Sequence, residues 1–148
     1  MDSNNVTLVP AEQQAQISRV MLQWLSGYSD KPLARLDYEN LGETSGLALS
    51  VIQGAIKTRQ YIDGTYQAQY QFKIIYRAIA ENAADRLDMD EALNEFGSWA
   101  ENNTTPPFFG DNIIVRKIKR DTAAAQFARY ENGAEDHQIL MTLIYEVI

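Results

Sequence analysis

Carboxylates are the side chains of this sequence with the clearest chemical potential, and they gather in one short stretch. Asp85, Asp88, Asp90 and Glu91 lie close together. Paired carboxylates can act as general acid and general base, and clustered ones can bind calcium. The glycine of a calcium-binding loop is absent, however, and Asp88 with Glu91 has the spacing of a helix capping box. Acids in a first turn also complement the helix dipole, so we interpret this group as the start of a helix.

The chain offers little else that could support catalysis. It has one histidine, His137, and no cysteine. A metal site usually needs several convergent ligands, and nucleophilic catalysis needs a positioned base. His137 is therefore expected to be a surface or hairpin residue just outside the last strand. Residues 42–46 lack the spacing and the lysine of a phosphate-binding loop. We expect no enzyme activity, no catalytic residue, no cofactor and no metal. The alternative is a small-ligand-binding or enzymatic domain of unknown substrate, with a pocket between sheet and helices.

The charge balance argues against a nucleic-acid-binding module. The formal net charge is −7, whereas nucleic-acid binders usually present a basic face to phosphates. The densest basic cluster is Arg116, Lys117, Lys119 and Arg120, which we interpret as a solvated strand end or hairpin tip. No apolar run approaches the ~20 residues of a membrane helix, and the N-terminus has no signal-peptide pattern. We expect neither a membrane partner nor specific nucleic-acid binding.

The most regular element is a long strand over residues 66–77. Apolar or aromatic side chains fill its even positions and are expected in the core: Tyr66, Ala68, Tyr70, Phe72, Ile74 and Tyr76. Polar side chains fill most odd positions, among them Gln67, Gln69 and Gln71. Because side chains on a strand alternate between its two faces, this pattern predicts one dry face and one wet face. The glutamines suit a partner surface as well as solvent. The aromatics could stack nucleobases, but we favour the core, since the helices need a face to cover.

Two helices are predicted to cover that dry face. The first has Pro10 at its first helical position and an apolar stripe at helical spacing: Ile17, Val20, Met21, Trp24, Leu25 and Tyr28. The second is expected to begin near Asp88, with Leu87 and Ala92 as a hydrophobic staple. Its stripe is Met89, Ala92, Leu93, Phe96, Trp99 and Ala100.

Further strands are predicted over residues 47–54, 56–62, 113–118, 123–130 and 138–147. Asp63-Gly64 and Asn132-Gly133 are hairpin signals. At the first hairpin, burial favours a three-residue loop with Gly64 in the left-handed conformation. That register places Gln60, Thr58 and Ile56 on the face of Tyr66, Ala68 and Tyr70. The 148-residue chain is thus expected to be one α+β domain over residues 1–148, with an antiparallel sheet and two main helices on one face.

The loop over residues 102–110 contains two adjacent phenylalanines beside Pro106-Pro107. Phe108 and Phe109 either anchor the loop in its own core or insert into a neighbouring subunit, and the sequence leaves both open. Together with Gln67, Gln69 and Gln71, they form the candidate assembly interface.

These residues also carry a family resemblance. Residues 60–66 (Gln-Tyr-Ile-Asp-Gly-Thr-Tyr), 69–72 (Gln-Tyr-Gln-Phe) and Tyr76-Arg77 precede a helix over residues 93–99, a proline loop and a closing hairpin. From about residue 46 to the C-terminus, the chain resembles minor capsid and tail-completion proteins of tailed bacteriophages and prophages.

The resemblance implies a tail-terminator-like α+β fold and a ring, commonly a hexamer, at the end of the tail tube. It implies a tail-tube protein and head-completion or connector proteins as partners. The expected location is the virion, at the tail or head–tail junction, and the host cytoplasm during assembly. The family has no catalytic residues to carry over.

Overall fold

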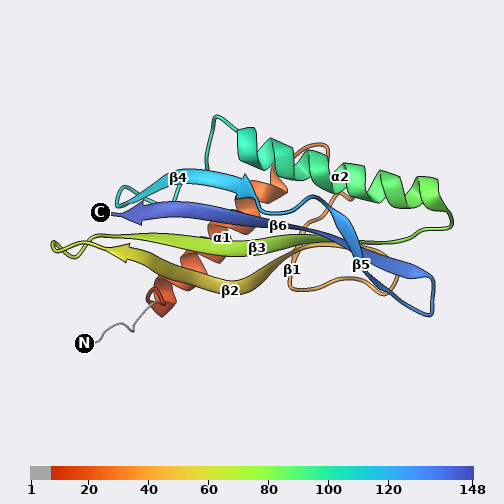
Figure 1. Cartoon of the computed structure of the whole chain (residues 1–148), viewed down its shortest axis with the longest axis horizontal. Coiled ribbons are helices and arrows are strands. Elements are labelled where there is room, and N and C mark those ends of the chain that lie inside the picture. Colours follow the sequence, from red (N-terminus) through yellow and green to blue (C-terminus); the bar gives the residue numbers. More distant parts are fainter. Residues whose placement is uncertain (1–7) are drawn as a thin grey trace.

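Two hairpins and two helices make up most of the molecule (Figure 1). The structure is a computed structural model that describes residues 8–148. In chain order the elements are α1 (Ala11–Ser26), β1 (Asp37–Tyr38), β2 (Gly46–Gln60), β3 (Tyr66–Ile79), α2 (Ala83–Asn102), β4 (Ile113–Arg120), β5 (Ala125–Arg129) and β6 (Ala134–Val147). β2 and β3 form one hairpin, and β5 and β6 form the other.

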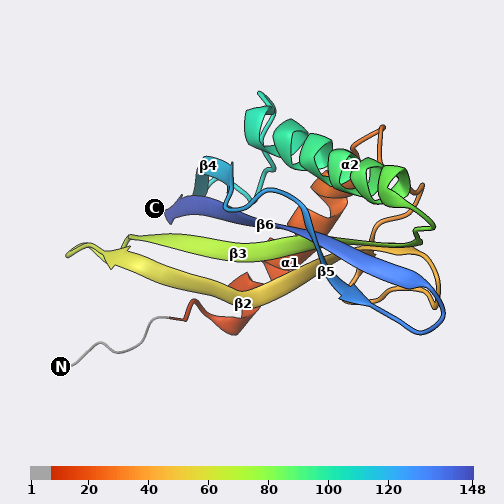
Figure 2. The same ribbon diagram turned by 45° about the vertical axis from the view of Figure 1, so that its right-hand side comes forward.

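The strands form one six-stranded sheet in the order β1-β2-β3-β6-β4, with β5 also paired to β6. β1 runs parallel to β2, and every other pairing is antiparallel. β4 pairs with residues 141–147 of β6, and β5 pairs with residues 135–138 on the same edge. Figure 2 shows the twist of this sheet. The predicted α+β fold with a mostly antiparallel sheet is confirmed.

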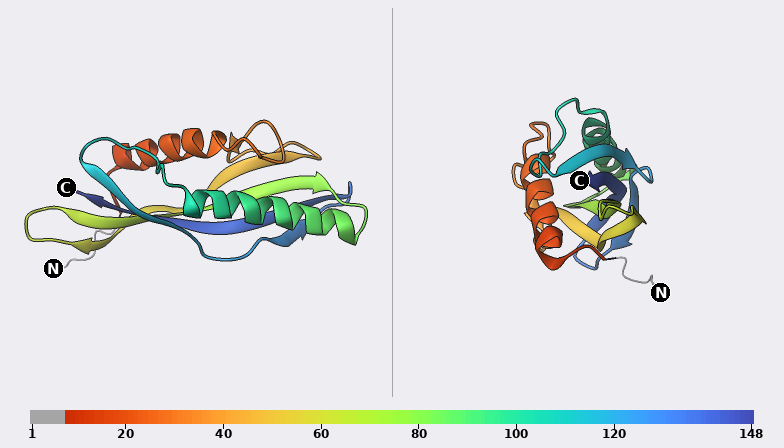
Figure 3. Two further views of the ribbon diagram at one scale, coloured as in Figure 1. Left: turned by 90° about the horizontal axis from the view of Figure 1, so that it is seen from above. Right: turned by 90° about the vertical axis from the view of Figure 1, so that its left-hand side faces the viewer.

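Both helices pack against the same face of the sheet, and one core joins them. Residues of α1 (Ile17, Met21, Leu25) and of α2 (Leu93, Phe96) belong to a single buried cluster with the inward side chains of β3 and β6. α1 lies toward the β2–β3 turn, and α2 lies over the opposite end of the sheet (Figure 3). Near their C-terminal ends the helices meet through aromatic rings, with Trp24 and Trp99 centroids 4.8 Å apart.

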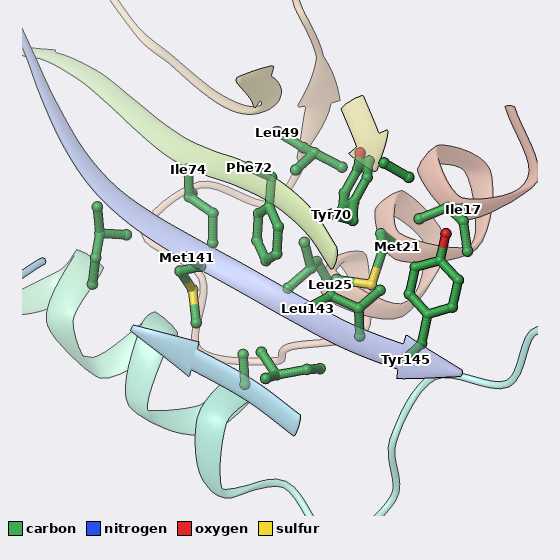
Figure 4. Close-up of a cluster of buried hydrophobic side chains, with 14 of the residues drawn as sticks. Ile17, Met21, Leu25, Leu49, Tyr70, Phe72, Ile74, Met141, Leu143 and Tyr145 are labelled. Atoms are coloured by element: carbon green, nitrogen blue, oxygen red, sulfur yellow. The ribbon is translucent and has the colours of Figure 1, made fainter. Parts of the chain in front are cut away.

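The alternation on β3 places its aromatics in the core as predicted. Tyr66, Tyr70 and Phe72 are buried, whereas Tyr76 is only half-buried. Figure 4 shows Tyr70 and Phe72 beside Ile74, with α1 residues packed nearby. Two of the buried phenols, those of Tyr70 and Tyr145, have partners in α1: Tyr70 shares a hydrogen bond with Ser18, and Tyr145 donates one to Gln13. Burial raises the pKa of both phenols.

The prediction of separate strands over residues 47–54 and 56–62 is wrong. β2 is one strand with an irregular register between Val51 and Gly54. Gly54 has φ of +77°, a left-handed conformation that glycine adopts without strain, so it bends the strand rather than ending it.

The three-residue loop of the first hairpin is confirmed, but the predicted register holds only next to it. The Tyr61 amide donates to the Thr65 carbonyl oxygen, and Gly64 has φ of +91°. Gln60 pairs with Tyr66 as expected. A second irregularity between Lys57 and Arg59 then shifts the pairing. Lys57 and Ala55 therefore face Ala68 and Tyr70, where the sequence predicted Thr58 and Ile56.

α2 begins at Ala83 and not near Asp88, so the predicted capping box is wrong. The side chain of the N-cap Asn82 accepts a hydrogen bond from the Asp85 amide. The Asp85 carboxylate in turn accepts one from the Glu81 amide. Leu87, the expected staple residue, is exposed. The apolar stripe itself is largely confirmed, since Met89, Leu93, Phe96 and Ala100 are buried.

Candidate assembly surface

The sheet face opposite the helices carries the three glutamines that the sequence singled out. On β3 they alternate with the buried Ala68 and Tyr70, so they project from the second face, which we call the open face. All three are half-buried. Since α1 and α2 both pack on the first face, neither helix covers Gln67, Gln69 or Gln71.

Each glutamine is the centre of a row that crosses the sheet. Its neighbours in these rows are charged, apolar or small. Across β2, β3 and β6 the rows are Arg59, Gln67 and Glu146; Ile56, Gln69 and Ile144; and Gly54, Gln71 and Thr142. The open face is therefore neither a purely solvated charged surface nor a second hydrophobic core. Such a composition is compatible with a non-obligate interface, which is about as apolar as the rest of a protein surface.

Two lysines of the basic cluster on β4 extend the open face at one edge of the sheet, whereas Arg120 lies on the helix side and binds Glu101 of α2. Lys117 pairs with Ile144, and Lys119 pairs with Thr142. The guanidinium of Arg116 lies 2.8 Å from the Glu146 carboxylate, whose hydrogen bond and negative charge raise the pKa of Arg116. Because this cluster lies on an edge strand and is partly paired with acids, it matches the expected strand end.

The two phenylalanines of the 102–110 loop have opposite environments. Phe109 is 2% exposed and stacks on Tyr145, with ring centroids 6.5 Å apart. Phe108 is 72% exposed. The structure therefore removes Phe109 from the candidate interface, because it plugs its own core, and leaves Phe108 on the surface.

A buried charged cluster lies at the N-terminal end of β6, and the sequence did not predict it. His137 is 1% exposed and sits inside β6, so its expected place outside the last strand is wrong. Its Nδ1 lies 2.6 Å from Asp90 of α2, and its Nε2 lies 3.2 Å from Glu135. Glu135 also binds Arg86 of α2 and Arg129 of β5, at 2.8 and 3.3 Å. This cluster ties three elements together.

Contacts with its neighbours keep the Glu135 carboxylate charged although it is buried. Removal from solvent would raise the pKa of Glu135, but hydrogen bonds from Arg86 and His137 and the charges of Arg86 and Arg129 outweigh this effect and lower it. Sequence spacing carried one signal for this network, because Glu135 and His137 alternate on a strand whose other odd residues face the helices.

The geometry of the cluster favours a structural role over acid–base chemistry. Both ring nitrogens of His137 already face carboxylates, and the ring has almost no exposed surface. A catalytic base must reach the proton that it removes. The carboxylates lie at opposite ring nitrogens and so do not converge on one point. Among residues 8–148, no group of three or more histidine and acidic side chains is arranged to hold a metal ion.

A second ion pair fixes the same end of β6 from the open side. Arg77 of β3 donates to both oxygens of Asp136, at 2.6 and 2.8 Å. It also donates to the Gly42 carbonyl oxygen, and Tyr130 donates to Asp136. The hydrogen bond to Asp136 is the main cause that raises the pKa of Arg77. This end of the open face is thus closed by internal contacts. The glutamine rows are closed only in part: Thr58 donates to Gln67, Glu146 pairs with Arg116, and Thr142 donates to Asp121.

None of the helices formed by residues 8–148 is long and apolar enough to cross a membrane. Comparison of the chain with models of known protein families and with curated proteins finds no match.

Proposed function

We propose that this chain is a structural protein of a phage or prophage particle. In this proposal it acts as a tail terminator or head–tail joining protein and forms a ring, with six subunits as the first expectation, at the end of the tail tube. Its partners are further copies of itself, the tail-tube protein and a head-completion or connector protein. Its place is the tail or head–tail junction of the virion, after assembly in the host cytoplasm.

The observation that carries this proposal is the open face with its glutamine rows. Half-buried amides that lie between charged and apolar neighbours can hydrogen-bond across a wet interface without the cost of burying a charge. The polar groups that could do chemistry support the same view, because those of His137, Glu135 and Asp136 are engaged in holding elements together. The sequence resemblance supplies the particular role.

The proposal is tested by adding charge to the glutamine rows. Gln67, Gln69 and Gln71 would be replaced together with lysine. A matched control replaces three exposed glutamines elsewhere, Gln23, Gln53 and Gln126, and adds the same charge. We expect both proteins to keep the circular dichroism spectrum of the parent, since neither set lies in the core.

Assembly should separate the two variants. Ring formation is measured by light scattering with the tail-tube protein present, and tail completion by phage complementation. We expect the open-face variant to fail in both assays and the control to succeed. Normal assembly and normal tails from the open-face variant would remove the glutamine rows from any interface and leave the proposed role without its structural support.

A further inference from the structure

Phe108 is an exposed apolar side chain on a loop that is held in place. Trp24 Nε1 donates to the Thr105 carbonyl oxygen at 3.0 Å, and Gln16 Nε2 donates to the Phe109 carbonyl oxygen at 2.7 Å. The burial of Phe109 gives a third attachment. An aromatic side chain on a preorganised loop can bind a partner with little cost in conformational entropy. Phe108 therefore has the properties of an interface anchor, and it needs a matching cavity.

A groove of about 550 Å³ runs along α1 beside the outer edge of β2. Apolar side chains make up most of its lining: Ala11, Ala15, Leu22, Tyr38 and Val51. The other three side chains in the wall are those of Gln14, Ser18 and Arg19, and the polar ends of the first two already have partners. Gln14 exchanges two hydrogen bonds with the backbone of Ala55, and Ser18 bonds to Tyr70. Apart from Arg19, the polar groups of the wall are satisfied, so the groove suits an apolar guest that has a negative charge beside it.

The anchor and the groove lie on opposite flanks of α1. Successive helical residues are rotated by about 100°, so Ala11, Ala15 and Leu22 project from one flank. Gln16 and Trp24, which hold the Phe108 loop, project from the other. The buried stripe of Ile17, Met21 and Leu25 lies between these flanks and faces the sheet. Since the body of α1 separates them, Phe108 cannot fill the groove of its own chain.

We propose that Phe108 of one copy inserts into the groove beside α1 of a second copy. The charges around the two sites are complementary. Arg19 lines the groove, and Asp111 follows Phe108 closely in the chain. Both side chains are exposed, and neither forms an ion pair with any other residue in the described part of the chain. Insertion would bring this unpaired cation and this unpaired anion into the same contact.

Because the anchor and the groove lie on opposite flanks of α1, each copy presents them to two different neighbours, and the contact is heterologous. Repetition of a heterologous contact yields a ring when the rotation closes, and an open filament when it does not. The inference rests on the self-assembly in the proposed function and identifies which flanks of the subunit meet. It leaves the glutamine rows free to contact a neighbour elsewhere or a different protein.

Three single variants test the contact in sedimentation velocity and native mass spectrometry. Phe108→Ser removes the anchor, and Ala15→Trp fills the groove from an exposed position. Leu87→Ser is the matched control, since Leu87 is also highly exposed but lies on α2. We expect the parent to self-associate and the first two variants to need about tenfold or more higher concentration. The control should associate like the parent.

A mixture of the two defective variants gives the sharpest result. The Ala15→Trp copy still has Phe108, and the Phe108→Ser copy still has an open groove. Mixed together, they can form one intact contact but cannot propagate it, so we expect a 1:1 heterodimer and no larger species. A mixture that remains monomeric would overturn the pairing of these two sites. So would a parent that stays monomeric at every concentration, or variants that associate as the parent does.

The phage role and the contact can fail separately. Oligomers that depend on Phe108 but do not complete tails in a complementation assay would retain the contact and reject the proposed function. Completed tails from both defective variants would reject the contact and retain the function.

Discussion

Phe72→Ala is expected to remove a large part of the stability of this fold. Phe72 is fully buried near the middle of β3, paired with Val51 on one side and Met141 on the other. It also lies against Tyr70, with ring centroids 5.7 Å apart. Because two neighbouring strands and the helices hold the walls of this site, we expect little collapse into the space that the ring leaves. Truncation of a buried phenylalanine costs roughly 3–5 kcal/mol, and the rigid surroundings favour the upper half of that range.

The change would be measured by urea unfolding at a concentration at which the parent is monomeric, with Phe108→Ala as the control. Both variants lose the same atoms, but Phe108 is 72% exposed, so its free energy of unfolding should change by less than about 0.5 kcal/mol. A loss of ~4 kcal/mol for Phe72→Ala corresponds to a fall of about 10 °C in melting temperature for a chain of this size. If Phe72→Ala lowers the free energy of unfolding by less than about 1 kcal/mol, the assignment of the even face of β3 to the core is wrong.

Three other perturbations test particular contacts. Gln14→Ala should lower the free energy of unfolding by about 1–3 kcal/mol, because two hydrogen bonds to the β2 backbone are lost. It should also increase light scattering, since the freed strand edge can pair with other copies, and Gln23→Ala is the control. Glu135→Gln should destabilise the protein at neutral pH. Since the pKa of Glu135 is lowered in the folded state, this difference should shrink as pH falls below about 4, as measured by unfolding at several pH values. Asn82→Ala should lower the free energy of unfolding, measured in urea, by about 1 kcal/mol, because Asn82 caps the helix. Asp88→Ala should change it little.

The strands that the sequence predicted best are those with one buried face along their whole length. On β6, Ile139, Met141, Leu143 and Tyr145 are all fully buried, so a period of two stays in phase over the part of the strand that the sequence predicted. β2 breaks that period twice, at Gly54 and near Thr58, and each irregularity moves the following residues to the other face. A pattern that changes phase resembles two short strands, which is why the sequence predicted a division.

The start of α2 was missed for a different reason. Its first turn contains small and acidic residues that contact little of the core, so no apolar stripe indicates a helix before Met89. The only local signal is Asn82 followed three residues later by Asp85, and the neighbouring acids Asp88 and Glu91 offered an equally good cap. The local spacing of residues therefore predicted that α2 is a helix but not the residue at which it begins.

The partners in the charged cluster could not have been predicted from spacing, because they depend on how separate elements approach one another. Glu135, Asp136 and His137 follow one another on β6, and all three are almost fully buried. A run of three polar residues beside a hairpin normally indicates solvent exposure. Here Arg86 reaches Glu135 from α2, and Arg77 reaches Asp136 from β3. Neither partner is near β6 in sequence.

These buried charges bear on how the molecule could assemble. Buried ion pairs are weak evidence of net stability, but loss of one partner is costly, so such pairs favour a single arrangement of the elements that they join. At this end of β6 they join α2, β5, β3 and the segment around Gly42. The charged groups of that end are paired within the chain, although the side-chain oxygen of the neighbouring Gln138 is buried without a hydrogen-bond partner among residues 8–148. The groove beside α1, the exposed Phe108 and the glutamine rows instead carry apolar and amide groups that the described chain does not cover. A molecule that is fixed internally at one end and leaves such surfaces elsewhere can meet a neighbour with little rearrangement, as the proposed ring-forming role requires.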